Sequence, residues 1–218
     1  MKVVLISDTH SNHLGLKLPQ GDLLIHAGDL TGRGSLNAIQ QVIAWLESKF
    51  EEYPMGVVVI AGNHDLSLDI DHSEYYMPAR GYMEHAKFHY LMNSGIQLEN
   101  GIKIWGSPAT PAFCGWAFNR EGNEIEKDWN LIPDDTNILI THGPAFGTLD
   151  KSYPPLSESL GCPRLVKHLK RLHDLKLHVF GHIHGGYGIE KEFHYYAVNA
   201  SVLNEQYKLV NNPIVVEI

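Results

Sequence analysis

Cysteine is scarce in this chain, which has only Cys114 and Cys162 among its 218 residues. Two thiols cannot form the disulfide network that holds small secreted domains together, so the fold must depend on a buried apolar core. Basic residues are also few, with 17 Lys and Arg against 25 Asp and Glu and a formal net charge of -8. This balance excludes a broad basic surface of the kind that binds long nucleic acids or an anionic membrane.

Long apolar runs are missing as well. No stretch approaches the roughly 20 apolar residues that a membrane-spanning helix needs. The first run, Val3 to Ile6, ends just before Asp8 and leaves no room for the apolar region of a signal peptide. We therefore expect a cytoplasmic protein without membrane contact; the sequence does not indicate its oligomeric state. Motifs typical of P-loop proteins, α/β-hydrolases and HExxH metalloproteases are also absent from the sequence.

The chain contains a series of short β-branched runs separated by helical patterns. Five continuous apolar runs predict strands that are buried on both faces of a sheet, at 3–6, 23–25, 57–60, 138–140 and 177–180. Three further runs, at 102–105, 193–198 and 214–218, also predict strands. Helical spacing of apolar residues follows a candidate N-cap at Ser35 and begins again at Pro163. This alternation predicts one α/β domain over residues 1–218, with a layered sheet core.

Side chains that can bind metal ions follow each of the five apolar runs. In open α/β sheets the ligand sites lie beyond the carboxyl ends of the strands, so one rim of the sheet can collect all of these side chains. In chain order the candidate ligands are Asp8, His10, Asp29, Asn63, His142, His182 and His184. Two of the pairs are two residues apart, and in extended backbone the side chains of such a pair point the same way.

These ligands are carboxylates, imidazoles and an amide, in a chain with 14 histidines. Such a set suits Mn²⁺, with Fe or Zn²⁺ as alternatives, better than a structural zinc site built from cysteines. Seven ligands are too many for one catalytic ion with an open position, but they fit two divalent ions that share a carboxylate. Isolated histidines such as His26 and His178 are expected to be packed or surface residues.

The order of these motifs resembles that of the calcineurin-like metallophosphoesterases. The signature D-x-H, G-D, G-N-H-[D/E], H and G-H-x-H is complete between Asp8 and His184. The chain is similar in particular to the subgroup of brain metallophosphoesterase-domain proteins (the adult-brain 239 family), through stretches such as 104–108, 141–144 and 199–201. The resemblance spans nearly the whole chain.

The resemblance implies a four-layer α/β/β/α sandwich with two metal ions at the sheet ends. One ion would be bound by Asp8, His10, Asp29 and His184, and the other by Asp29, Asn63, His142 and His182. His64 then corresponds to the catalytic histidine that does not bind metal, and Asp65 is placed to orient it. The chain departs from the subgroup at Gly185, where those proteins carry glutamate, and after Pro144; both positions concern the substrate more than the chemistry.

The expected chemistry is phosphoester hydrolysis by a hydroxide that bridges two metal ions, because metal coordination lowers the pKa of water towards 7. His64 would donate a proton to the leaving oxygen or stabilise the phosphoryl group as an imidazolium. Trp116, Asn119 and Arg120 lie close together in the sequence and could stack on and read a base, and His13 stands near the first ligand turn. We therefore expect a phosphodiesterase that acts on small nucleotide-type substrates.

Three alternatives stay open at this point. A phosphomonoesterase or protein phosphatase could use the same metal centre, because the centre does not decide between monoesters and diesters. A scaffold protein could keep the fold and lose catalysis, but such proteins usually lose a ligand or the catalytic histidine, and here none is missing. A nuclease is the third alternative, and the net charge of -8 argues against a long polymeric substrate.

Overall fold

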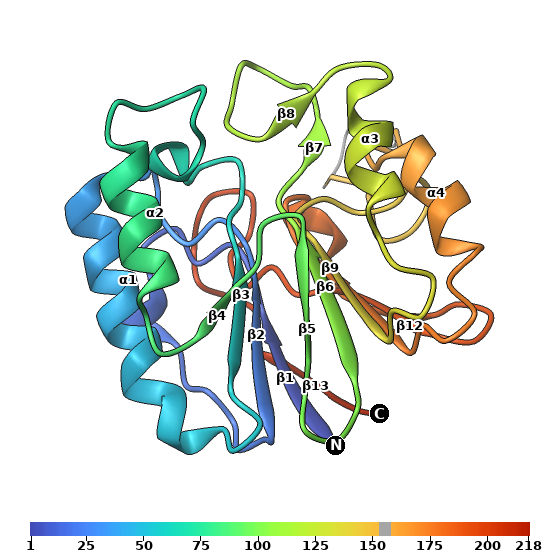
Figure 1. Cartoon of the computed structure of the whole chain (residues 1–218), viewed down its shortest axis with the longest axis horizontal. Coiled ribbons are helices and arrows are strands. Elements are labelled where there is room, and N and C mark those ends of the chain that lie inside the picture. Colours follow the sequence, from blue (N-terminus) through green and yellow to red (C-terminus); the bar gives the residue numbers. More distant parts are fainter. Residues whose placement is uncertain (153–157) are drawn as a thin grey trace.

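Two β-sheets lie face to face in the computed structural model, which describes residues 1–152 and 158–218 (Figure 1). The first sheet contains β1 (Lys2–Ile6), β2 (Leu23–Ala27), β3 (Val57–Ile60), β4 (His89–Tyr90) and β13 (Ile214–Glu217), in the order β13-β1-β2-β3-β4. The second contains β5 (Ser94–Gln97), β6 (Lys103–Ser107), β9 (Ile138–Thr141), β10 (Leu177–Phe180), β11 (Gly188–Lys191) and β12 (Tyr196–Asn199), in the order β11-β12-β10-β9-β6-β5. A short pair, β7 (Thr110–Pro111) and β8 (Asn119–Arg120), forms a sheet of its own.

Helices cover the outer face of each sheet (Figure 1). The helices α1 (Leu36–Lys49) and α2 (Tyr76–Glu84) lie against the first sheet, and α3 (Glu124–Asn130) and α4 (Pro163–Leu169) lie against the second. Short 3₁₀ turns lie at η1 (His13–Gly15), η2 (Phe50–Glu52), η3 (Leu66–Leu68) and η4 (His184–Gly186). As predicted, Ser35 caps α1, since its Oγ accepts a hydrogen bond from Ala38 N at 3.3 Å. Within the described ranges, no helix is both long and apolar enough to cross a membrane.

Alternate side chains of β1 divide between two apolar clusters, as the two-residue period of a strand requires. Val4 and Ile6 pack with buried residues of α1 and α2. Val3 and Leu5 face the other way and pack against β9, β10 and β12 of the second sheet. A third cluster joins the outer face of the second sheet to α3 and α4. Three apolar interfaces therefore separate four layers, which confirms the predicted α/β/β/α sandwich.

The carboxyl ends of the central strands meet at one rim. In the first sheet β1, β2 and β3 run parallel, and in the second β6, β9, β10 and β12 run parallel. A parallel bridge between Ser7, after β1, and Ser201, after β12, connects the two sheets at this rim. The segments that follow β1, β2, β3, β9 and β10 are thereby brought to one place.

In the sequence, Tyr75, Tyr76 and the stretch to Tyr82 suggest a loop that could act as a lid. In the structure, residues Tyr76–Glu84 form helix α2 instead, and its Tyr76, Ala79 and Met83 are buried against the first sheet. Pro78 lies in the first turn of this helix, where a residue without an N–H is tolerated. The segment is part of the core and not a lid over the rim.

Candidate metal centre and active site

The rim brings all seven candidate ligands together in two groups. Within each group the ligand atoms lie within 4.8 Å of one another. The first group consists of Asp8, His10 and His184, and the second of Asp29, His142 and His182. Asn63 joins the second group, because its Oδ1 lies 2.9 Å from His142 Nε2. The two groups match the two metal ions that the family resemblance implies.

Asp29 lies between the two groups. Its Oδ2 is 3.4 Å from His10 Nε2, and its Oδ1 is 3.3 Å from His142 Nε2. Oδ1 also accepts a hydrogen bond from the backbone N–H of His64 at 2.8 Å. Each carboxylate oxygen thus faces one group, which is the arrangement that a carboxylate shared by two metal ions requires.

Hydrogen bonds turn one nitrogen of each of two imidazole rings towards the ligand groups. His184 Nδ1 donates to Asn204 O at 2.9 Å, and His142 Nδ1 donates to Ala27 O at 3.0 Å, so Nε2 of both rings faces these groups and can bind a metal ion in exchange for a proton. His10 Nε2 is buried and has no hydrogen-bond partner among the described residues. A buried nitrogen without a partner is costly, and coordination of a metal ion would satisfy it. The donor set therefore fits divalent metal ions.

Opposite charges pair across the two sheets at this site. Burial would lower the pKa of His142, but the Asp29 carboxylate outweighs it and raises that pKa to about 9. In His184 burial is likewise outweighed, here by Asp8, and the pKa again rises to about 9. Burial opposes ionisation of both carboxyl groups, yet the neighbouring histidines hold their pKa well below the usual range. The carboxylates are thus kept ionised, as metal binding needs, and acidification should weaken binding because the metal competes with protons on the histidines.

Several ligand positions have strained backbone. The left-handed region, rare for residues other than glycine, is occupied at Asp8 (φ 55°), His10 (φ 40°), Asp29 (φ 52°) and His182 (φ 67°). The turns are also tightly packed, because a Cβ atom on Gly181 would collide with the side chains of Asp8 and Ser7. Strain of this kind gathers at functional sites, where the surrounding structure holds the residues in unfavourable conformations.

His64 stands beside both groups, and its ligand atom lies within 4.8 Å of those of His10 and Asp29. Its Nδ1 donates to Gly32 O at 2.9 Å, so Nε2 points away from that carbonyl. The ring stacks on Trp116 with centroids 4.2 Å apart and 22° between the planes, and it meets His10 edge-on at 4.5 Å. The expected catalytic histidine is therefore held on two sides next to the metal ligands.

The expectation that Asp65 orients His64 is not met, because its carboxylate makes other hydrogen bonds. Oδ2 accepts from the backbone N–H of Leu30 at 3.1 Å and of Gly62 at 2.9 Å. Oδ1 accepts from both the backbone N–H and the hydroxyl of Thr31, at 2.9 and 2.8 Å. Asp65 thus ties the loop after β2 to the loop after β3, and the Gly32 carbonyl takes the orienting role.

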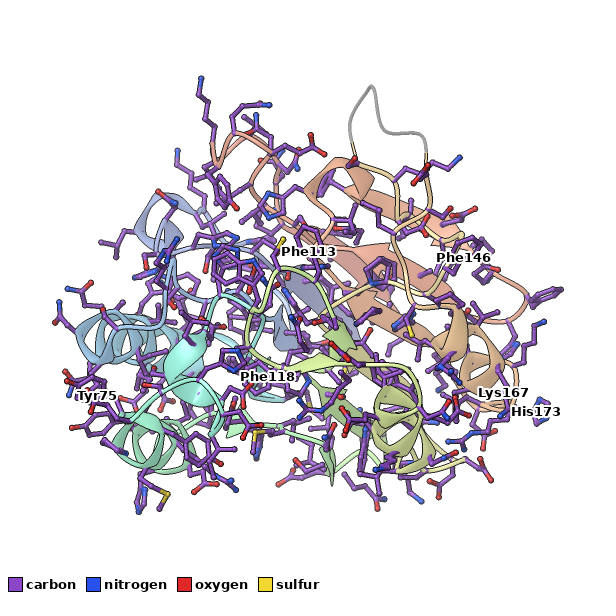
Figure 2. All side chains as sticks on the ribbon, turned by 90° about the horizontal axis from the view of Figure 1, so that it is seen from above. Tyr75, Phe113, Phe118, Phe146, Lys167 and His173 are labelled. Atoms are coloured by element: carbon purple, nitrogen blue, oxygen red, sulfur yellow. The ribbon has the colours of Figure 1, made fainter. Side chains whose placement is uncertain are left out.

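A pocket of about 490 Å³ opens beside the two groups of ligands. Apart from the ligands and His64, its lining is largely apolar and includes Phe113, Trp116, Leu160, Ile183 and Tyr207. Figure 2, which looks onto the rim from above, shows Phe113 near the middle of this face, with Tyr75 and His173 at opposite edges. The pocket offers room for an organic group attached to a phosphate held at the rim.

Of the four expected substrate residues, only Trp116 is among the described residues that line this pocket. Its ring already packs against His64, and the Arg33 guanidinium lies 5.5 Å from the ring centre. Asn119 donates to a backbone carbonyl of its own loop at 2.8 Å. Arg120 pairs with an aspartate of α3 and lines a neighbouring pocket. His13 is buried against α1. The structure therefore gives Asn119, Arg120 and His13 structural surroundings away from the pocket.

Comparisons with known proteins agree with the geometry of the site. The model of the calcineurin-like phosphoesterase family matches residues 1–186. The chain belongs to this family. It is 39% identical to human Metallophosphoesterase domain-containing protein 1, over 100% of this chain and 71% of that protein. It is 32% identical to the Caenorhabditis elegans UPF0046 protein K07C11.7, over 99% of this chain and 74% of that protein.

A solved structure shows the shared fold. The crystal structure of TT1561 of Thermus thermophilus superimposes with a TM-score of 0.58 and 12% identity, covering 91% of this chain and 88% of that one. Family membership and the two groups of ligand side chains together support phosphoester hydrolysis that depends on divalent metal ions. The resemblance seen in the sequence motifs is thus confirmed at the level of the family.

This calcineurin-like phosphoesterase has a site residue that sequence reasoning did not single out, Ser201. Its Oγ lies 2.7 Å from Asp8 Oδ2, and the backbone N–H of His182 donates to both oxygens of Asp8 at 3.0 Å. Ser201 follows β12, far from Asp8 in the chain, and the bridge between Ser7 and Ser201 brings it close to Asp8. The one signal in the sequence was its place in a stretch that resembles the subgroup.

We expect Ser201→Ala to weaken metal binding by about tenfold to a hundredfold, because residues that orient a ligand carboxylate commonly contribute this much. Titration of the metal-free protein with Mn²⁺ in a calorimeter measures the change. Ser48→Ala is a matched control, since that hydroxyl bonds to Trp45 O within α1. Unchanged Mn²⁺ affinity in Ser201→Ala would show that Asp8 keeps its orientation without the serine.

Proposed function

We propose that this protein is a two-metal phosphodiesterase that acts on small nucleotide-type substrates. The observation that carries the proposal is the position of the Asp29 carboxylate. Its two oxygens face two different groups of ligands, and it lines a largely apolar pocket. Two divalent ions, with Mn²⁺ favoured and Fe or Zn²⁺ as alternatives, would activate water and compensate the charge on the phosphoryl oxygens.

Each of the two ions would be held by its own set of side chains. The first set is Asp8, His10, Asp29 and His184, and the second is Asp29, Asn63, His142 and His182. Asp8 and Asp29 supply the negative charge, and the hydrogen bonds to Ala27 O and Asn204 O orient two of the imidazoles. These residues would hold the phosphoryl group of the substrate at the rim, next to His64.

His64 is placed to act on the leaving group. Hydrolysis forms a bond between phosphorus and a water oxygen and breaks the bond to the ester oxygen, which leaves as an alcohol and needs a proton. A protonated His64 can give this proton from Nε2 and keep the Nδ1 proton that it shares with Gly32 O. The Gly32 carbonyl and the Trp116 ring hold the imidazole in one orientation during the transfer.

The pocket favours a diester over a monoester. Among the described residues that line it there is no Lys or Arg to compensate the second negative charge of a monoester. A diester carries one charge and a second organic group, and the apolar wall at Phe113, Leu160 and Ile183 suits such a group.

Turnover of bis-p-nitrophenyl phosphate and of p-nitrophenyl phosphate by the Mn²⁺-loaded protein tests the proposal. We expect kcat/KM to be at least about tenfold higher for the diester, a difference of about 1.4 kcal/mol in transition-state binding. The chelated protein serves as the blank. A clear preference for the monoester would contradict the proposal and favour a phosphomonoesterase.

A further inference from the structure

A small turn from Leu203 to Leu209 stands at the edge of the pocket, beyond the residues 1–186 that the family model matches. Leu203 and Leu209 pair as an antiparallel bridge. Inside the turn, Asn204 O accepts from the backbone N–H of Tyr207 at 2.8 Å, and Asn204 Oδ1 accepts from that of Lys208 at 3.0 Å. Tyr207 has a left-handed φ of 55°. The turn thus holds this tyrosine in a conformation that it would not adopt freely.

The ring of Tyr207 lies against the metal ligands and the catalytic histidine. Its centroid is 4.9 Å from that of His10 and 5.5 Å from that of His184, both edge-on, and 6.2 Å from that of His64. Yet 52% of the residue stays exposed, and it lines the pocket. One part of the ring is therefore fixed against the site while another part faces the space where the substrate would lie.

The same carbonyl positions both the tyrosine and a ligand. Asn204 O accepts from His184 Nδ1 at 2.9 Å as well as from the N–H of Tyr207. This carbonyl thus connects the turn that carries the aromatic ring to the candidate ligand His184. The Trp116 ring, in contrast, already packs against His64 and Arg33. Phe113, which is 63% exposed, lines the pocket from another loop.

We propose that Tyr207 is a specificity-determining residue that selects phosphoesters carrying a flat aromatic group, such as a nucleobase or a phenyl ring. The inference rests on the proposed function for the place of the phosphoryl group at the rim. Tyr207 packs against the aromatic group of the substrate and favours it over an aliphatic group of similar charge. Stacking on one aromatic side chain supports a preference of about tenfold.

Binding of phenylphosphonate and methylphosphonate to the Mn²⁺-loaded protein tests this role by calorimetry. The two probes share the anionic group and differ in the organic one, and their P–C bond is not a phosphoester, so the result does not depend on turnover. We expect the native protein to bind phenylphosphonate about tenfold more tightly than methylphosphonate. In Tyr207→Leu the ratio of the two affinities should fall towards one, whereas Tyr207→Phe should keep the native ratio because the ring remains.

Phe193→Leu is the matched control, since this aromatic residue is 91% exposed and does not line the pocket. The inference would be overturned if the ratio of the two affinities in Tyr207→Leu stays near the native value. The same holds if both probes lose affinity equally at unchanged metal content. If Tyr207→Leu removes the ratio but the native protein cleaves no diester, the inference on Tyr207 stands and the phosphodiesterase proposal fails. The two failures are therefore distinguishable.

Discussion

Asp29→Asn should lower diester turnover by at least about a thousandfold, because it removes the carboxylate that both ligand groups share. The carboxylate lies 3.4 Å from His10 Nε2 through one oxygen and 3.3 Å from His142 Nε2 through the other. An amide has no charge and offers only one oxygen, so it can serve only one of the two ligand groups. The loss should appear in kcat/KM for bis-p-nitrophenyl phosphate and in the metal content per chain measured by mass spectrometry.

The same substitution at an aspartate far from the rim serves as the control for a general change in charge. Asp135 is 54% exposed and pairs with Lys103 away from the rim, so Asp135→Asn should leave turnover and metal content unchanged. If Asp29→Asn binds two metal ions per chain and keeps turnover within about tenfold of the native value, Asp29 is not the shared ligand.

His64→Ala should lower turnover by about a hundredfold to ten-thousandfold, the range typical of a lost general acid, and should leave the metal content intact. The loss should also depend on the leaving group. p-Nitrophenolate departs easily without a proton, whereas phenolate is more basic and needs one. Comparing p-nitrophenyl and phenyl diesters in native protein and variant measures this, and we expect the larger loss with the phenyl ester.

His173→Ala is the control for this experiment, because His173 is exposed at the edge of the molecule, away from the rim (Figure 2). An equal loss on both esters would show that His64 stabilises the phosphoryl group and does not protonate the leaving oxygen. A loss of metal ions would instead make His64 a ligand, a role open to it because His10, Asp29 and His64 also hold their ligand atoms within 4.8 Å.

The strands and the candidate ligands could be predicted because their signals are local. A run such as Val57–Ile60 has no polar residue and is buried on both sides, so its character is visible in the sequence. The residues directly after it, Gly62 to His64, must then lie at the rim. Helix α2 was missed because Pro78 and Gly81 interrupt its helical pattern, and burial against the first sheet outweighs that local preference.

The supporting residues could not be predicted because their contacts connect distant parts of the chain. Ser201 reaches Asp8 only after the two sheets have packed together. Tyr207 meets His10 because a turn near the end of the chain folds back over its beginning. For the same reason Asp65 could be placed at the rim by its motif, but its hydrogen-bond partners, which are mostly backbone groups, could not be inferred from spacing.

The metal centre takes its ligands from both sheets, so its geometry depends on how the two sheets pack against each other. Asp8, Asp29 and Asn63 follow strands of the first sheet, whereas His142 and His182 follow strands of the second. The spacing between these halves depends on the bridge between Ser7 and Ser201 and on the close packing of the apolar layer between the sheets. A shift of that layer too small to unfold the protein would pull the two halves out of alignment. Buried aliphatic residues far from the pocket thus help to set the spacing of the metal ligands, and substitutions among them should disturb that spacing as well as folding.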